Sequence, residues 1–267
     1  MTDLEHPMHY STNPLFDLTG RTAVVTGGSR GIGFMAARGL LQAGATVVLS
    51  SRKADACEKA CVELRDFGEV YAIPADLARE DECLRLAAAV GAQWEQVDIL
   101  VNNAGAAWGA PLEEFPASGW DKVLDLNLKS PFFLTRALLP QLERAATDDH
   151  PARVINVGSI DGIRVPEQSS YSYSASKAAL HHLTRVLAAE LGRRRITVNA
   201  VAPGPFESKM MAATLEAHGD QIAASSPLGR IGRSDDIAGV TVFLASRAGS
   251  YVTGAVVPVD GGIATTR

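Results

Sequence analysis

The sequence predicts an α/β fold in which a doubly wound, mainly parallel sheet of about seven strands carries helices on both faces. Two observations support this fold class. Short runs of β-branched and other apolar residues alternate along the chain with longer segments of helical periodicity. These short runs are continuously apolar and do not alternate with polar residues, which is typical of parallel strands that are buried on both faces.

The predicted elements follow one another in strict alternation. Strands are expected at residues 23–26, 46–50, 70–76, within 98–105, and at 153–159, 196–204 and 256–262. Helices are expected at residues 32–43, 54–67, 79–94, 118–144, 171–192 and 234–245. Pro131 should introduce a local irregularity into the fourth of these helices. Each helix would return the chain to the start of the next parallel strand through a right-handed crossover.

The chain contains no low-complexity linker, so we expect a single catalytic domain at residues 17–267, preceded by a polar, partly ordered arm at residues 1–16. Residues 203–231 form the longest irregular or weakly helical stretch. Loops of this length in compact domains are often active-site lids. We therefore expect a substrate lid at about residues 203–231.

Composition excludes several classes of protein. The net charge of −5 argues against a nucleic-acid binder. The chain start lacks the basic and apolar regions of a signal peptide, and no run of about 18 apolar residues occurs, so no membrane association is expected. Cys57, Cys61 and Cys83 form no CxxC pair and are interpreted as reduced helix residues, not metal ligands. This composition predicts a cytoplasmic protein without a metal site.

A glycine-rich turn, TGGSRGIG at residues 26–33, lies between the first predicted strand and the first helix. Glycines permit a tight turn, and the free N–H groups at the start of the helix favour a phosphate. The spacing differs from the common G-x-G-x-x-G pattern, so a plain turn is the alternative. Its position in a βαβ unit favours a Rossmann-like dinucleotide site. The expected contacts are Gly27, Ser29, Arg30, Gly31, Ile32 and Gly33.

The end of the second strand indicates the type of cofactor. An NAD site usually has an acidic residue there, to bind the ribose hydroxyl groups. Here Ser51 and Arg52 are followed by Lys53, and Arg30 could approach the same place. Because guanidinium groups suit a 2′-phosphate, the sequence favours NADP(H) over NAD(H), with Ser51 and Arg52 as contacts. The alternative is that Arg52 and Lys53 are solvated surface charges.

Further candidate contacts follow the third and fourth strands. Asp76, with Leu77 beside it, could accept a hydrogen bond from an adenine amino group or could cap the next helix. The segment after the fourth strand, with Asn103, Ala104 and Gly105, could line the adenosine ribose. Its amides could equally tie neighbouring strands together, and both roles are compatible.

Tyr173 and Lys177 are the first candidates for catalysis. Residues at i and i+4 share a helix face, with Cβ atoms roughly 5–6 Å apart. An ammonium beside a phenol lowers its pKa from about 10 towards the neutral range in which general acid–base catalysis works best. Ser159 follows the fifth strand, where a hydroxyl could bind a substrate carbonyl. Asn127 lies in the middle of a predicted helix, although Asn is unfavourable in helix interiors. Each feature alone is commonplace.

The motifs TGGSRGIG, NNAG, LNL around Asn127, Ser159, YSASK and the Pro-Gly pair at residues 203–204 occur in this order on the expected elements. From about residue 20 to residue 262, the chain resembles the short-chain dehydrogenase/reductase family. The resemblance implies that Tyr173 is the proton donor, and that Lys177 lowers its pKa and holds the nicotinamide ribose. It further implies that Ser159 orients the carbonyl and that Asn127 holds a water linking Lys177 to solvent.

The same resemblance implies cofactor contacts at Pro203, Gly204 and Ser208, with Ser208 standing where the family often has a threonine. A departure lies between Ser159 and Tyr173. The charged side chains there are not explained by the family pattern, and they are Asp161, Arg164 and Glu167.

Several stretches resemble NADPH-dependent 3-oxoacyl (β-ketoacyl) reductases of the rhamnolipid type, namely AIPADL, DILVNNAG followed by WGA, PARVIN and SKAALHHLTR. The expected reaction is hydride transfer between NADP(H) and a carbonyl or secondary alcohol, with a 3-oxoacyl thioester or similar apolar ketone as substrate. The alternatives are a polyol or sugar dehydrogenase, or an alicyclic alcohol (steroid-like) dehydrogenase. A non-catalytic NADP-binding regulator is a further alternative, which the intact Ser159, Tyr173 and Lys177 argue against.

The predicted lid carries apolar residues that could cover such a substrate or could simply pack on a short amphipathic helix. They are Phe206, Met210, Met211, Leu215 and Ile222. By resemblance we also expect a homotetramer, in which the helices at 118–144 and 171–192 pair across one interface and the C-terminal strand pairs across another.

Overall fold

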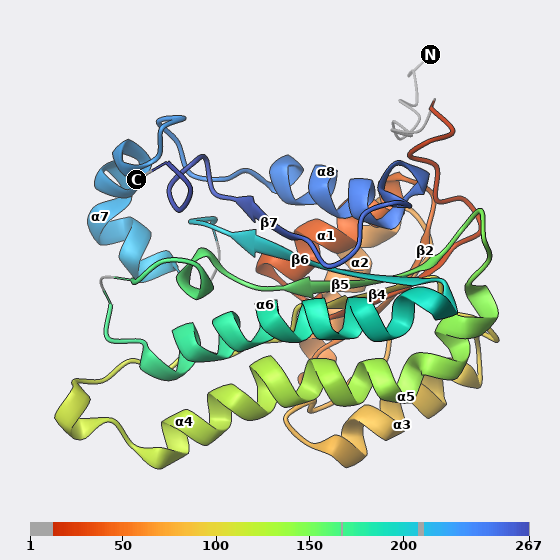
Figure 1. The fold of residues 1–267 in the computed structure, drawn as a ribbon, viewed down its shortest axis with the longest axis horizontal. Coiled ribbons are helices and arrows are strands. Elements are labelled where there is room, and N and C mark those ends of the chain that lie inside the picture. Colours follow the sequence, from red (N-terminus) through yellow and green to blue (C-terminus); the bar gives the residue numbers. More distant parts are fainter. Residues whose placement is uncertain (1–12, 167, 208–210, 267) are drawn as a thin grey trace.

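The computed structural model describes residues 13–166, 168–207 and 211–266 of the chain. Within them, one fully parallel sheet has the strand order β3-β2-β1-β4-β5-β6-β7 (Figure 1). The order reverses direction between β1 and β4, as expected for a doubly wound sheet. The strands are β1 (Thr22–Thr26), β2 (Thr46–Ser50), β3 (Val70–Ala72), β4 (Ile99–Asn102), β5 (Ala152–Val157), β6 (Ile196–Pro203) and β7 (Val256–Val259).

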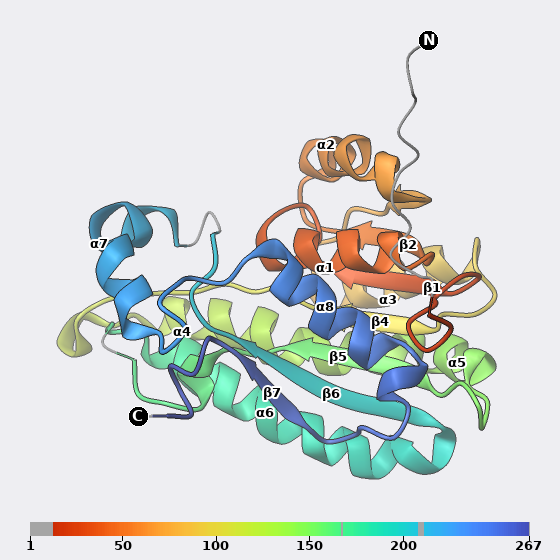
Figure 2. The same ribbon diagram turned by 90° about the horizontal axis from the view of Figure 1, so that it is seen from above.

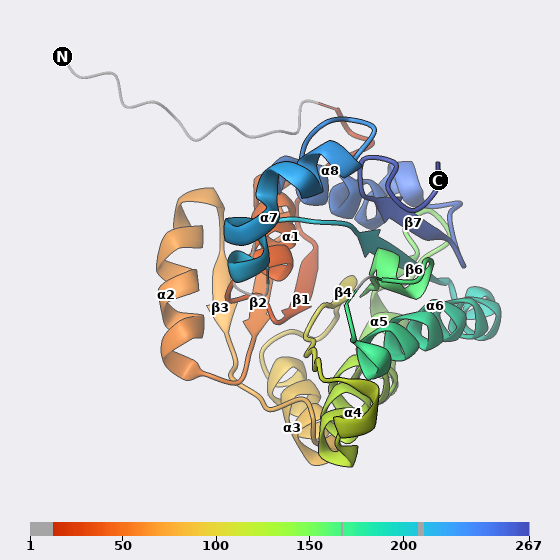
Figure 3. The ribbon, with the colours of Figure 1, turned by 90° about the vertical axis from the view of Figure 1, so that its left-hand side faces the viewer.

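Helices cover both faces of the sheet, as predicted. Figure 3 looks along the strands and shows α1, α2 and α8 on one side, with α3, α5 and α6 on the other. The long helices are α1 (Gly31–Gln42), α2 (Ala54–Leu64), α3 (Glu80–Gly91), α5 (Ser130–Ala145), α6 (Tyr171–Leu191) and α8 (Ser234–Ala245). None of the helices in the described ranges combines the length and apolarity of a membrane span.

Burial on both faces explains the continuously apolar strands. Val25 and Val47 belong to the core cluster under α1, α2 and α8. Val24 and Val48 belong to the cluster under α3, α5 and α6. Because successive side chains of a strand point to opposite faces, both faces demand apolar residues here.

Close helix packing completes the first of these layers. Figure 2 shows α8 lying along α1. A methyl group at Gly39 of α1 would lie 2.8 Å from the Cα atom of Ala238 in α8. Glycine at this position is therefore what permits the two helices to approach so closely.

The helix predicted at residues 118–144 is divided in three. It consists of α4 (Ala117–Leu124), a π-helical turn (Asp125–Lys129) and α5. The irregularity expected at Pro131 is this π turn, which ends two residues before the proline, because the missing N–H of Pro131 cannot continue the helical hydrogen bonds. Single π turns frequently occur at functional sites, and this one carries Asn127.

Two other boundaries differ from the prediction. The third strand ends at Ala72 and not at Asp76, since Pro74 cannot donate to a strand ladder. The weakly helical stretch at 203–231 contains a defined helix, α7 (Ala212–Ser225). In Figure 1, α7 lies at the end of the molecule to which the arrow of β6 points, which is the carboxyl edge of the sheet.

Candidate active site

Ser159 and Tyr173 meet beyond the carboxyl end of β5. Ser159 follows the strand and is buried, with 7% of its surface exposed. Its hydroxyl oxygen accepts a hydrogen bond from the Asp161 backbone N–H at 3.1 Å, as the N-cap of a short 3-10 turn, Ile160–Gly162. Tyr173 lies in the first turn of α6 and forms a side-chain hydrogen bond with Ser159.

The electrostatics of Tyr173 differ from the sequence-based expectation. Burial raises the pKa of Tyr173, the hydrogen bond with Ser159 lowers it, and the nearby Asp161 carboxylate raises it. The predicted lowering by Lys177 is therefore not what dominates in this structure. The physical reason is desolvation, because burial disfavours the charged phenolate form of Tyr173. The spacing of residues along a helix does not show this burial.

Lys177 is buried beside this tyrosine, with 4% of its surface exposed. Its ammonium lies 5.6 Å from the centroid of the Tyr173 ring and donates to the carbonyl oxygen of Val157 at 2.7 Å. Desolvation lowers the pKa of Lys177 to about 8. The fold thus holds a cation that titrates close to neutral pH beside the phenol.

Asn127 lies next to this group on the π turn, and 1% of its surface is exposed. Its Oδ1 accepts from the Ala106 N–H at 2.8 Å, while its Nδ2 donates to the Ala106 carbonyl oxygen at 2.9 Å and to Ser176 Oγ at 3.0 Å. A methyl group at Gly105 would lie 3.3 Å from Asn127 Oδ1 and 3.8 Å from Lys177 Nζ. Gly105 therefore separates Asn127 from Lys177, and the Asn127 side chain fixes the loop after β4.

His181 belongs to this cluster and was missed by the sequence analysis. It follows Lys177 by one helical turn and is 5% exposed. Burial, with a contribution from Lys177, lowers the pKa of His181 to about 4, so the ring is neutral at pH 7. Its Nε2 accepts from the Ser159 N–H at 3.5 Å. The spacing of Tyr173, Lys177 and His181 at successive i+4 positions could have indicated it.

Among the described residues between Ser159 and Tyr173, Asp161 is the charged one that acts on the phenol. It is half-buried, and burial raises the pKa of its carboxyl group while Arg164 opposes this. Arg164 itself is exposed. Glu167 lies outside the described residues.

The glycine turn is shaped for a close approach of the backbone. Gly27 and Gly31 have φ angles of 63° and 56°, which are costly for other residues. A methyl group at Gly33 would lie 2.3 Å from Asn103 Nδ2 and 2.5 Å from the Gly27 carbonyl oxygen. The N-cap residue of α1, Arg30, makes no side-chain capping bond in the described structure. This cradle and the open helix start fit a dinucleotide phosphate. Ser29 and Ile32 are half-buried beside it.

The amides after β4 tie strands together. Asn103 Nδ2 donates to the carbonyl oxygens of Thr26 and Gly27 at 2.9 and 3.1 Å. The Thr26 hydroxyl oxygen accepts from the N–H groups of Asn103 and Ala104 at 2.9 and 3.0 Å. Of the two roles considered for these amides, the structural one is present, and it also holds the glycine turn in place.

The residues expected around the adenosine lie along the same edge. Arg30 and Arg52 are both exposed, at the start of α1 and directly after β2, and Ser51 is half-buried. Asp76 is half-buried and is not the helix cap, because the N-cap of α3 is Arg79. Leu77 is 3% exposed and packs into the core, so its side chain does not face solvent.

Comparison with known proteins agrees with this geometry. A family model described as Enoyl-(Acyl carrier protein) reductase matches residues 27–264. The rhamnolipids biosynthesis 3-oxoacyl-[acyl-carrier-protein] reductase of Pseudomonas aeruginosa is 50% identical over 256 residues, which cover 94% of this chain and 98% of that protein. This chain belongs to the short-chain dehydrogenase/reductase family. The predicted family is confirmed.

Other members of the short-chain dehydrogenase/reductase family are similar to this chain in structure or in sequence. A solved structure, the Pseudomonas aeruginosa RhlG/NADP active-site complex, has a TM-score of 0.92 at 49% identity and covers 94% of this chain and 99% of that chain. The predicted fold class is thereby confirmed. The gluconate 5-dehydrogenase of Gluconobacter oxydans is 35% identical over 252 residues, covering 93% of this chain and 96% of that protein.

The segment after β6 lies at the carboxyl edge of the sheet in this short-chain dehydrogenase/reductase. Pro203 ends β6, and the Gly204 N–H donates to the Val259 carbonyl oxygen at 3.0 Å. Phe206 is 3% exposed and packs with Ala36 and Ile237, which favours the packing role over a role as substrate cover. Ser208 and Met210 lie outside the described residues.

The loops after β4 and before α6 carry exposed apolar side chains. The rings of Phe115 and Tyr171 are 5.5 Å apart, and the Ala110 N–H donates to the Ser169 carbonyl oxygen at 3.3 Å, so the loops after β4 and before α6 lie side by side. Large hydrophobic side chains stand exposed on these two loops, namely Leu112 at 66%, Ile163 at 44% and Val165 at 89%.

Proposed function

We propose that this protein is an NADP(H)-dependent oxidoreductase that reduces the carbonyl group of a 3-oxoacyl thioester or a similar apolar ketone to a secondary alcohol. The observation that carries the proposal is the gathering of Ser159, Tyr173 and the buried Lys177 at the end of β5. The 50% identity to a 3-oxoacyl-[acyl-carrier-protein] reductase and the likeness to an NADP complex support it.

In this mechanism, the hydride that reaches the carbonyl carbon comes from bound NADPH. The Ser159 hydroxyl donates a hydrogen bond to the carbonyl oxygen and orients it. As negative charge develops on that oxygen, Tyr173 transfers its phenolic proton to it, and the alcohol forms. The raised pKa of Tyr173 keeps the phenol protonated at neutral pH, which suits a proton donor. The Lys177 ammonium, 5.6 Å from the ring centroid, stabilises the resulting phenolate.

The glycine turn would hold the pyrophosphate, and the guanidinium groups of Arg30 and Arg52 would hold a 2′-phosphate. Their exposure at one edge of the sheet, with no acidic residue among Ser50, Ser51 and Arg52, supports NADP over NAD. Lys177 would hydrogen-bond the nicotinamide ribose from its buried position. Asp76 remains free of a capping role and is assigned to the adenine.

The surroundings of Tyr173 support an apolar substrate. Leu112, Ile163 and Val165 expose large hydrophobic side chains on the loops after β4 and before α6, and residues 203–231 with α7 are assigned as a substrate lid. Asp161 adds a negative charge close to the phenol. A substrate with a carboxylate next to its carbonyl would be repelled there. A 3-oxoacyl thioester has no free carboxylate next to its carbonyl and would avoid this repulsion.

A panel of ketones tests the proposal. NADPH oxidation is followed with a medium-chain 3-oxoacyl thioester, a keto-sugar acid and an alicyclic ketone, each with NADPH and with NADH. We expect the thioester and NADPH to give the highest kcat/KM. Tight NADPH binding without turnover of any substrate would favour the regulator instead, and a higher kcat/KM for the keto-sugar acid would favour the sugar dehydrogenase.

Tyr173→Phe isolates the proposed proton donor. We expect it to lose about 10²-fold or more in kcat while NADPH binding, measured by fluorescence titration, stays nearly unchanged. Tyr171→Phe is the matched control, because Tyr171 lies on the same helix turn but has no lysine one turn later. Full activity in Tyr173→Phe would sink the assignment.

We propose a homotetramer in which α4, α5 and α6 pair with their copies across one interface and β7 contributes to another. Exposed aromatic side chains on these elements support this, since Trp120 is 39%, Phe132 is 39% and Tyr251, before β7, is 103% exposed. Light scattering coupled to size exclusion should give four times the chain mass. A dimer mass would contradict the proposal.

A cytoplasmic location is also proposed. The three cysteine side chains, Cys57, Cys61 and Cys83, are buried and free, which suits a reducing compartment. Cell fractionation with antibody detection would test it, and recovery in a membrane or secreted fraction would contradict it.

A further inference from the structure

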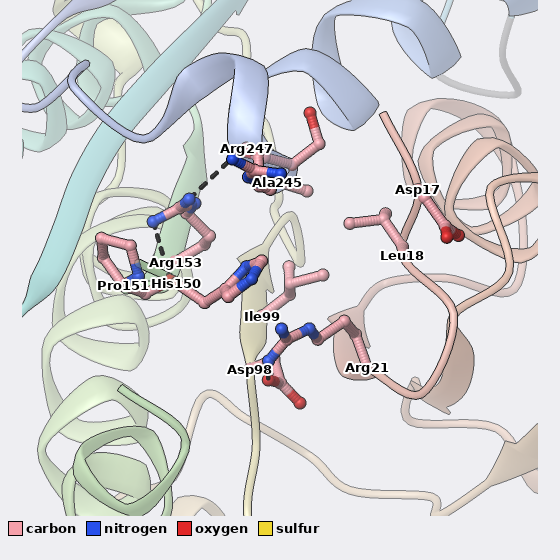
Figure 4. Close-up of a pocket in the computed structure, with 11 residues that line it drawn as sticks. Asp17, Leu18, Arg21, Asp98, Ile99, His150, Pro151, Arg153, Ala245 and Arg247 are labelled. Atoms are coloured by element: carbon pink, nitrogen blue, oxygen red, sulfur yellow. Dashed lines mark hydrogen bonds and ion pairs between the residues drawn. The ribbon is translucent and has the colours of Figure 1, made fainter. Parts of the chain in front are cut away.

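A polar cavity lies at the opposite edge of the sheet from Ser159. It opens beside the amino ends of β1, β4 and β5 and is bounded by the end of α8 (Figure 4). Arg153 stands at the start of β5, whereas Ser159 follows its end, so the length of the strand separates the two places. The charged and titratable residues that line the cavity are Asp17, Arg21, Asp98, His150, Arg153 and Arg247.

Arg153 is the unusual member of this group. Only 2% of it is exposed. Its Nη1 donates to the Pro151 carbonyl oxygen at 2.7 Å and its Nη2 donates to the Ser246 carbonyl oxygen at 3.1 Å. The buried Nε has no hydrogen-bond partner. Across the described ranges of the chain, no carboxylate forms an ion pair with this guanidinium.

The two acidic residues of the cavity already accept hydrogen bonds from other groups. Asp98 accepts from Arg21 Nη1 through Oδ1 and from the Thr22 N–H through Oδ2, both at 2.9 Å. Asp17 accepts from the backbone N–H of Thr19 at 3.0 Å and from its hydroxyl at 2.6 Å. These carboxylates are therefore committed to other donors and leave Arg153 uncompensated.

The remaining groups add positive potential and no negative charge. Burial, together with the neighbouring Arg21, lowers the pKa of His150, so the ring is neutral at pH 7. Burial and Arg21 also lower the pKa of Arg153 to about 10, which leaves it charged at that pH. Arg247 is exposed and lines the same cavity. Three guanidinium groups thus face two carboxylates that already have partners.

We propose that this cavity binds a small oxyanion of the phosphate or sulfate class, held between Arg153 and Arg247. A buried cation without a counter-charge is costly, and an anion beside the guanidinium would lower that cost. Guanidinium groups match tetrahedral oxyanions in geometry as well as charge. The site is distinct from the cofactor and substrate positions of the proposed function, and it does not depend on them.

Isothermal titration with inorganic phosphate, at constant ionic strength set with chloride, tests the site on the full-length protein. We expect saturable binding to the wild type and a loss of affinity of at least about tenfold in Arg247→Gln. Arg153→Met should abolish binding. Because Arg153 is buried and its variant can misfold, Arg247→Gln at the exposed rim decides the matter on its own. Arg193→Gln, an exposed arginine that does not line the cavity, should bind phosphate like the wild type.

Arg30 and Arg52 of the proposed cofactor site could also attract phosphate, so the titration is repeated on the double variant Arg30→Gln, Arg52→Gln. Unchanged binding is expected there. Loss of the phosphate signal in this double variant would place the anion at the two arginines of the proposed cofactor site and overturn the proposal. An absence of saturable binding to the wild type, or wild-type affinity in Arg247→Gln, would overturn it equally.

Discussion

The Lys177 ammonium lies 5.6 Å from the centroid of the Tyr173 ring, and its position is fixed by a 2.7 Å hydrogen bond to the Val157 carbonyl oxygen. The cation is held by the end of β5 and is buried, so its charge costs stability. The same burial strengthens its electrostatic effect on the phenol. Activity and stability should therefore respond in opposite directions when Lys177 is replaced.

Lys177→Met should lose about 10²-fold or more in kcat and yet increase the free energy of unfolding at pH 7 by roughly 1–3 kcal/mol. The folded pKa of about 8 lies below the reference value of 10.5, so the unfolded chain binds more protons between these values. Wild-type stability then rises with pH through this window, and the gap to the variant narrows.

Urea unfolding of both proteins at pH 7 and at pH 10 measures this effect. Lys59→Met, at an exposed position of α2, is the control and should change stability by less than about 0.5 kcal/mol. A variant at Lys177 that is less stable than the wild type at pH 7 would contradict the account of its burial.

Asp161 should tune the pH dependence of reduction. Its negative charge raises the pKa of Tyr173, so Asp161→Asn should lower that pKa. Reduction requires the protonated phenol, and the alkaline limb of kcat/KM should move to lower pH. The variant should also reduce anionic ketones better relative to neutral ones. Asp121→Asn, at an exposed position of α4, serves as control. An unchanged profile would remove Asp161 from the site.

Arg30 and Arg52 should determine the preference of the enzyme for NADPH over NADH. The double variant Arg30→Gln, Arg52→Gln should raise KM for NADPH by about 10- to 100-fold and leave KM for NADH nearly constant, because only the former cofactor offers a 2′-phosphate. Steady-state kinetics with both cofactors measure this, with the exposed Arg65→Gln as control. Equal losses for the two cofactors would show that the arginines do not bind that phosphate.

Gly33 should tolerate no side chain, unlike Gly239. A methyl group at Gly33 would meet Asn103 Nδ2 at 2.3 Å, whereas none of the described residues approaches a methyl group at Gly239 within 4 Å. Gly33→Ala should cost about 1–3 kcal/mol of stability and weaken NADPH binding at least tenfold. Gly239→Ala, within α8, should stabilise by about 0.5–1 kcal/mol. Similar behaviour of the two variants would contradict the tight packing of the turn.

The sequence by itself determined the α/β class, the element order and the motif positions that indicate the family. These depend on local properties, since a strand buried on both faces must be apolar and a tight turn must contain glycine. Tyr173 and Lys177 were also readable as candidates, because an i+4 spacing defines a shared helix face, and Ser159 was readable because it follows the fifth predicted strand. The assignment of their roles stays a proposal.

Tertiary structure alone decided how these groups are charged and what surrounds them. Desolvation depends on atoms distant in sequence, and it reversed the expected shift of the Tyr173 pKa. The π turn at Asn127, the neutral His181 under Ser159 and the uncompensated Arg153 follow equally from packing between separate elements. No sequence spacing reports such contacts, because the residues meet only when the strands and helices assemble around the core.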